Sequence, residues 1–155
     1  MSKAFGATGG SISVFSKDTA EFISRFANPY IFGGPLSLSG VAAIVESCKI
    51  HLSDEIYERQ QKLYSNINFF DSQYLPYEIV NNKQLIPIRG IKINDEDKAI
   101  KLGKYLLEKG YVLTCATYPT VDLGKAMLRL AISSLHTEKQ ILGLINYINK
   151  FYNAQ

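Results

Sequence analysis

Cysteine is scarce in this sequence. Cys48 and Cys115 are the two thiols of the chain, and their separation fits neither a disulfide framework nor the paired spacing of a metal site. Two unclustered cysteines are typical of a protein in a reducing compartment. We therefore expect a cytoplasmic protein without a structural metal.

Long apolar segments are absent as well. The longest purely aliphatic run is Val41–Val45, whereas a membrane-spanning helix needs about 20 apolar residues. The first residues do not make a signal peptide, because glycines and polar residues interrupt them before a continuous apolar region forms. The sequence thus predicts no membrane segment.

Basic residues are present but scattered. The formal net charge is +3, and no run of lysines and arginines occurs. Proteins that bind nucleic acid usually gather their basic residues into a patch or a stripe. We therefore do not expect nucleic acid as a partner.

The second half of the chain has the pattern of an α/β layer. Of the 155 residues, 46% are hydrophobic and 20% are charged, which is close to a globular average. Alternating and apolar runs predict three strands, at 86–93, 111–116 and 127–133. A helix is expected over 95–110, with Gly110 ending it. Thr137 and Gln140 have the spacing of a capping box that opens the last helix. We expect these elements to form a three-stranded sheet backed by helices.

The first half of the chain does not continue this pattern. Ser11–Phe15 predicts a short strand, and Ser16–Phe26 predicts a helix with Ser16 as its N-cap. Prolines and glycines punctuate Asn28–Gly40, which is typical of a shaped loop. Helical spacing then begins at Val41 and again near Leu52. We expect the first 40 or so residues to belong to a larger sheet-and-helix domain.

The first ten residues hold a lysine among glycines, namely Lys3 with Gly6, Gly9 and Gly10. Most lysines are surface charges, and that interpretation is the simpler one by composition. The alternative is a nucleophilic lysine that forms an imine with an aldehyde cofactor, and glycines would let the backbone approach a bulky cofactor closely. Two nucleotide-binding motifs fail on spacing: Ser11, not lysine, follows the last glycine, and no strand precedes the first.

Three separated segments resemble those of one enzyme family. Ser2–Gly10 ("SKAFGATGG") is similar to the cofactor-lysine segment of the α-oxoamine synthases, and Pro29–Ile44 resembles their loop that enters a long interdomain helix. Tyr118–Ile141 looks like their C-terminal signature, with an active-site loop, a strand bearing an arginine, and a final helix. The segments occur in the family's order and cover essentially the whole chain.

This resemblance implies a fold and a division of the chain. The family consists of pyridoxal-phosphate enzymes of the aspartate-aminotransferase fold (fold type I), so an α/β fold is expected. Residues 1–51 would be the tail of the cofactor-binding large domain with the interdomain helix. Residues 52–155 would be the C-terminal small α/β domain. The complete enzyme would be a homodimer.

The resemblance also implies roles for two residues. Lys3 corresponds to the lysine that holds pyridoxal phosphate covalently and moves the α-proton of the substrate. Arg129 corresponds to the arginine that binds the carboxylate of the amino acid, a task that suits a planar, bidentate guanidinium. The alternative for Arg129 is an arginine at a strand edge that pairs with a surface acid. We interpret His136 as a structural residue near a helix N-terminus and His51 as a helix-end residue.

The implied activity is a condensation of an amino acid with an acyl-CoA. The family's chains are longer, so the resemblance implies a large domain, on this or a separate chain, that supplies most cofactor contacts; this chain alone would be inactive. Two alternatives stay open: another aminotransferase-like enzyme of class I or II, and a non-catalytic packing or dimerisation module.

Overall fold

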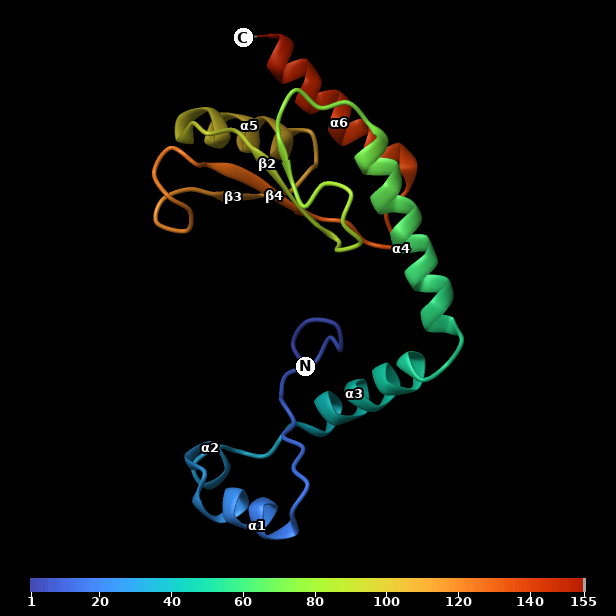
Figure 1. Ribbon diagram of the computed structural model, residues 1–155, viewed down its shortest axis with the longest axis vertical. Coiled ribbons are helices and arrows are strands. Elements are labelled where there is room, and N and C mark those ends of the chain that lie inside the picture. Colours follow the sequence, from blue (N-terminus) through green and yellow to red (C-terminus); the bar gives the residue numbers. More distant parts are fainter. Residues whose placement is uncertain (155) are drawn as a thin grey trace. The chain divides into compact units, whose positions relative to one another are not determined.

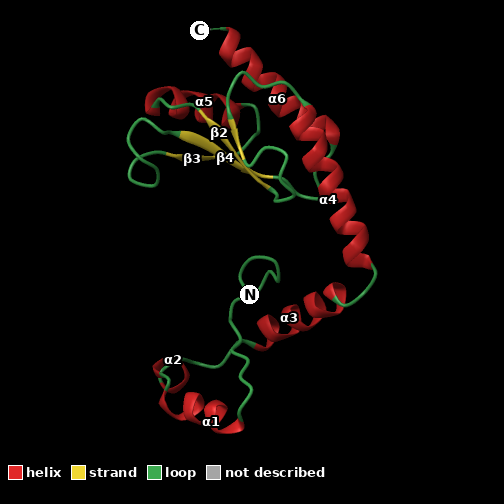
Figure 2. Cartoon of the chain, viewed as in Figure 1, coloured by secondary structure: helices red, strands yellow, loops and turns green. Residues whose placement is uncertain are grey.

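The computed structural model describes residues 1–154. The chain divides into two units, Met1–Ile56 and Tyr57–Gln155. Figure 1 shows the elements in chain order, and Figure 2 shows that the strands all belong to the second unit. The structure confirms the expected α/β class. The predicted assignment of residues 1–51 to a large domain and 52–155 to a small domain stays a prediction.

The first unit is helical. It contains α1 (Lys17–Phe26), α2 (Asn28–Ile31) and α3 (Leu38–His51). Ser16 is the N-cap of α1, as predicted, because its hydroxyl accepts a hydrogen bond from the Thr19 amide. Ser37 caps α3 in the same way, so this helix begins before Val41.

Two expectations for the first unit are wrong. Ser11–Phe15 is not a strand; it is exposed, and no strand pairs with it among the described residues. A strand needs a neighbour for its backbone groups, so the sequence pattern alone does not form one. The segment 28–40 is not wholly a loop, since α2 lies within it and α3 begins there.

The second unit is built on one antiparallel sheet with the strand order β1-β2-β4-β3. Its strands are β1 (Ile79–Val80), β2 (Ile88–Lys92), β3 (Thr114–Ala116) and β4 (Met127–Ala131). The three predicted strands are present. The expected count of three is corrected to four, because the two-residue β1 is too short to show an alternating pattern.

Three helices pack on one face of this sheet: α4 (Glu55–Ser72), α5 (Glu96–Glu108) and α6 (Glu138–Asn153). Side chains from α5 and α6, such as Leu102 and Ile148, are fully buried with Ile91 and Leu128 of the sheet. A second cluster joins α4 to α6 and to the end of β4. This face therefore contains the core of the unit.

Local signals set the ends of α5 and α6. Gly110 has a φ of +85° and follows α5, where the Tyr111 amide bonds the Leu106 carbonyl at 2.9 Å, so the helix stops as predicted. Thr137 and Gln140 form the expected capping box at the start of α6.

A buried ion pair fastens α4 to the sheet. Arg89 of β2 is fully buried, and its Nε and Nη2 atoms donate to the two carboxylate oxygens of Asp71 at 2.7 Å each. Arg89 also donates to the backbone carbonyls of Gln84, Ile86 and Ile88. The guanidinium is thus satisfied by acceptors on all sides, as a buried charge requires.

Candidate functional site

The segment around Lys3 forms a closed loop. The Gly6 amide bonds the Lys3 carbonyl at 3.0 Å, and the N-terminal ammonium donates to the Gly9 carbonyl at 2.8 Å. Gly6 and Gly9 have φ values of +61° and +125°, which L side chains rarely adopt. At Gly9 a Cβ would also lie 2.9 Å from the end of the Leu36 side chain, which would have to move aside.

Helix α3 holds this loop in place. The Ser47 hydroxyl donates to the Phe5 carbonyl at 3.0 Å. The Phe5 ring stacks on the His51 ring, with centroids 4.8 Å apart and planes 9° from parallel. His51 is the last residue of α3, as expected, and its Nδ1 lies 2.7 Å from the Ser47 carbonyl. The loop is therefore fixed to its own unit.

Lys3 itself is exposed, and within residues 1–154 no hydrogen bond or ion pair engages its amine. The amine is chemically available, and the glycines beside it leave the backbone open to a neighbouring group. These features fit a lysine that binds an aldehyde cofactor. They do not include burial of the amine, because Lys3 is exposed.

Arg129 lies in the middle of the sheet. Its strand, β4, has β2 on one side and β3 on the other, and Arg129 is opposite Gly90 and Thr114. Leu128 and Leu130, its neighbours in the strand, pack on the helices. Because strand side chains alternate, Arg129 is directed to the other face, where it is exposed.

The guanidinium of Arg129 has no acid partner among the described residues. Across the described residues 1–154, no hydrogen bond or ion pair engages it. Neither of its cross-strand neighbours, Gly90 and Thr114, carries a carboxylate. The alternative of a strand-edge arginine paired with a surface acid is therefore wrong, and a cation is free to bind an external anion.

The loop before β4 carries its own ion pair. Lys125 Nζ lies 2.7 Å from Asp122 Oδ2 in an exposed position. The hydrogen bond from Lys125, together with its charge, holds the pKa of Asp122 below the ordinary value, and the same contact raises the pKa of Lys125. These two charges satisfy each other, so they do not compete with Arg129 for a ligand.

His136 is structural, as expected. It lies in the turn before α6, where its Nδ1 accepts from the Ser133 amide at 3.1 Å. Asn66 of α4 holds the same turn, because its side-chain amide donates to the carbonyls of Ser133 and His136 at 2.8 Å each. The sequence did not predict a role for Asn66. Asn66 is fully buried, and this burial becomes apparent only in the folded structure.

The described residues contain neither a candidate metal site nor a membrane-spanning helix. No group of three or more His, Cys, Asp or Glu residues within 1–154 could hold a metal ion. In the same residues, no helix has the length and the apolar character needed to cross a membrane.

The chain is similar to a known protein family and to named members of it. The family described as "Aminotransferase class I and II" matches residues 1–148. An 8-amino-7-oxononanoate synthase from Petrotoga mobilis is 34% identical over 144 residues, covering 91% of this chain and 35% of that protein. The enzyme of the same name from Thermosipho melanesiensis is 32% identical over 141 residues, with the same coverage. The chain thus spans about a third of the length of these relatives.

A solved structure gives the same result for the fold. The 8-amino-7-oxononanoate synthase of Francisella tularensis superimposes with a TM-score of 0.75 at 29% identity, covering 99% of this chain and 44% of that one. The arrangement of helices and strands described above is therefore that of a portion of this enzyme fold.

Proposed function

Because the chain belongs to the aminotransferase class I and II family, we propose that it is part of a pyridoxal-phosphate-dependent α-oxoamine synthase, which condenses an amino acid with an acyl-CoA. The names of its relatives support this subgroup. The proposed partners are the amino acid, the acyl-CoA and a second copy of the complete enzyme.

One observation carries the proposal: Arg129 lies on the exposed face of a strand paired on both sides, and no residue in 1–154 pairs with its guanidinium. A guanidinium binds a carboxylate through two parallel hydrogen bonds, which fixes the orientation as well as the position of the substrate. The pairing of β4 on both sides holds the Arg129 backbone rigidly. Arg129 would therefore orient the α-carbon of the amino acid toward the reacting groups.

Lys3 would have two tasks. Its Nζ would hold the cofactor before the amino acid arrives, and the freed amine would then take the proton from the substrate α-carbon. Pyridoxal phosphate, when bound, supplies an electron sink for the charge that this proton leaves behind. Proton removal requires a neutral amine, and lysine in water is almost entirely protonated at neutral pH. This chain covers about a third of its relatives' length. The segment of those proteins that it does not cover would bury the Lys3 amine.

The test combines this chain with a polypeptide that covers the remaining length of the Petrotoga mobilis relative. After addition of pyridoxal phosphate, borohydride reduction and peptide mapping should label Lys3. Lys3→Ala should abolish the labelling, and Lys17→Ala, which changes an exposed lysine of α1, should leave it intact. Labelling spread evenly over the lysines would contradict the role of Lys3.

Turnover distinguishes the proposed reaction from transamination. The combined enzyme should release free CoA from an acyl-CoA when a suitable amino acid is present. Arg129→Lys should raise the KM for the amino acid about tenfold or more, because one bidentate contact is lost. Lys92→Ala removes a cation of β2 that Glu78 already neutralises and should change KM much less. Amino transfer to a keto acid without CoA release would instead identify an aminotransferase.

A further inference from the structure

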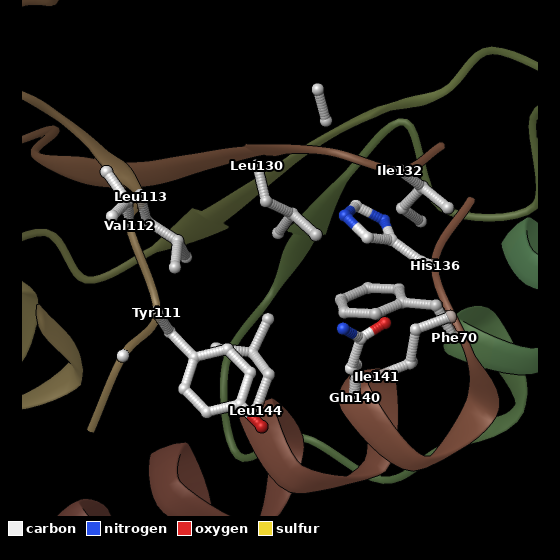
Figure 3. Close-up of a pocket in the computed structure, with 12 residues that line it drawn as sticks. Phe70, Tyr111, Val112, Leu113, Leu130, Ile132, His136, Gln140, Ile141 and Leu144 are labelled. Atoms are coloured by element: carbon white, nitrogen blue, oxygen red, sulfur yellow. The ribbon is translucent and has the colours of Figure 1, made fainter. Parts of the chain in front are cut away.

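A pocket lies on the helix-covered side of the sheet in the second unit. It has a volume of about 260 Å³ and is bounded by the end of β4, the start of α6 and the segment after α5. Its walls are mostly apolar, and they include Phe70, Leu130, Ile132, Ile141 and Leu144 (Figure 3). Leu130 is the neighbour of Arg129 but faces the opposite side of the sheet, so this pocket is separate from the proposed catalytic site.

Tyr111 forms a further wall. Its hydroxyl occupies the space where a Cβ of residue 143 would stand, so the close approach of this ring to α6 depends on Gly143. Because this wall rests on helix backbone, the pocket has a rigid side.

Two polar side chains project into the pocket, and the first is His136 (Figure 3). Its Nδ1 accepts the Ser133 amide hydrogen, so in the neutral ring the proton is on Nε2. No hydrogen bond within residues 1–154 uses this Nε2–H group. The turn therefore presents a donor, not an acceptor, to the pocket.

The second polar side chain is Gln140. Its Oε1 accepts from the Thr137 amide at 2.9 Å and lies 3.1 Å from the Thr137 hydroxyl, as the capping box requires. This bonding fixes the orientation of the amide group and leaves its NH₂ without a partner among the described residues. The capping box and the histidine turn thus use the acceptor atoms of these two side chains and leave two side-chain donors, Gln140 Nε2 and His136 Nε2.

From this arrangement we propose that the pocket binds a short aliphatic acyl group, whose carbonyl or carboxylate oxygen accepts hydrogen bonds from His136 Nε2 and Gln140 Nε2. The apolar walls receive the hydrocarbon chain. A protonated amine head group is itself a donor, so it would accept a hydrogen bond from neither His136 Nε2 nor Gln140 Nε2. The pocket is therefore selective for acceptor head groups.

The test titrates the full chain with octanoate below its micelle-forming range, with NMR detection of the Gln140 side-chain amide and the His136 ring. Saturable shifts confined to the pocket residues are expected. Methyl octanoate in a parallel titration distinguishes a carbonyl from a carboxylate ligand, and saturable binding of either supports the proposal. Octylamine should not bind. Equal binding of octylamine and octanoate, or no saturable shift with either acyl compound, would overturn it.

Two variants test the donors without unfolding the helix. Gln140→Glu keeps an oxygen for the capping box but replaces the donor by a carboxylate, and it should weaken octanoate binding about tenfold or more. Gln61→Glu adds the same charge on the exposed side of α4 and should leave the affinity unchanged. His136→Asn keeps an acceptor for the Ser133 amide on a shorter side chain and should also weaken binding. Unchanged affinity in both pocket variants would show that the donors do not make the site.

Discussion

The two units differ in what their apolar side chains contact. In Tyr57–Gln155, two clusters of fully or nearly fully buried residues join the sheet to α4, α5 and α6. In Met1–Ile56, Ala7 is the one described residue that is buried, and α1, α2 and α3 bury none. Phe22 and Phe26 of α1 contact each other but stay about two-thirds exposed. The second unit thus carries its own core, while the first consists of helices fixed by local signals.

The largest contrast should come from one ion pair in each unit. Asp71→Ala leaves the buried Arg89 without its counter-ion, and we expect a loss of about 3–5 kcal/mol in the free energy of unfolding of the second unit. Glu21→Ala removes an exposed i,i+4 pair with Arg25 in α1 and should cost about 0.5 kcal/mol or less. Urea denaturation followed by tyrosine fluorescence measures the first effect, and helical circular dichroism measures the second.

A control separates charge from shape at this pair. The double variant Asp71→Leu/Arg89→Met replaces both ions by apolar groups and should recover part of the lost stability, although the carbonyls that Arg89 served lose their donor. Equal losses in the double and single variants would mean that the unpaired charge is not the cause, and that the hydrogen bonds from Arg89 to the backbone carbonyls matter as much.

Truncation of one apolar side chain in each unit should give the next effect. Leu102 is fully buried between α5 and the sheet, so Leu102→Ala should cost about 2–5 kcal/mol. Phe22 is 63% exposed, so Phe22→Ala should change stability by about 0.5 kcal/mol or less. Thermal denaturation of both variants provides the comparison. A loss in Phe22→Ala as large as that in Leu102→Ala would show that the first unit has a packed core after all.

Helix caps provide a smaller contrast. Thr137→Ala removes the cap of α6, a helix whose residues are in the core, and should lower the unfolding free energy of the second unit by about 1 kcal/mol. Ser16→Ala removes the equivalent hydrogen bond at α1. Because no residue of α1 is buried, its loss should reduce helicity locally and leave the midpoint of the second unit unchanged. A shift of that midpoint in Ser16→Ala would mean that the units unfold together.

Much of the second unit was predictable because its signals are local. Alternation in 86–93, the stop at Gly110 and the spacing of Thr137 and Gln140 each depend on a few neighbouring residues, and the structure confirms all three. Ser11–Phe15 failed for the opposite reason. A strand depends on a partner strand, and sequence periodicity does not say whether one is present.

The candidate sites, too, were predictable only where they depend on local sequence. Motif resemblance predicted Lys3 and Arg129 as site residues, and that stays a prediction. The exposure of the Arg129 guanidinium depends on the register that places Gly90 and Thr114 opposite it. Register is a long-range property, and it left no signal in the sequence. Gln140 was predicted as a capping residue from its spacing. That its NH₂ group borders a pocket and has no partner in residues 1–154 depends on the folded structure.

The smallest predicted effect concerns pH and a single hydroxyl. The hydroxyl of Tyr77 is buried and has no hydrogen-bond partner in residues 1–154, and its ring meets Tyr152 edge-on. Burial, and next the proximity of Tyr152, raise the pKa of Tyr77 above its ordinary value of 10.0. The folded protein therefore keeps this proton at a pH where the unfolded chain has released it. The contribution of Tyr77 to stability is fully present below about pH 10 and is lost as the pH rises toward the raised value.

Tyr77→Phe tests this directly. The variant keeps the ring contacts and removes a hydroxyl that bonds nothing, so its stability at pH 7 should equal or slightly exceed that of the parent. Between about pH 10 and 11, its unfolding free energy should fall less steeply with pH, as measured by urea denaturation across a pH series. Tyr118→Phe changes a tyrosine that is 64% exposed and should keep the parent slope. An unchanged slope in Tyr77→Phe would show that Tyr77 titrates alike in the folded and unfolded chain, and the alkaline weakening of the second unit would then have to come from another group.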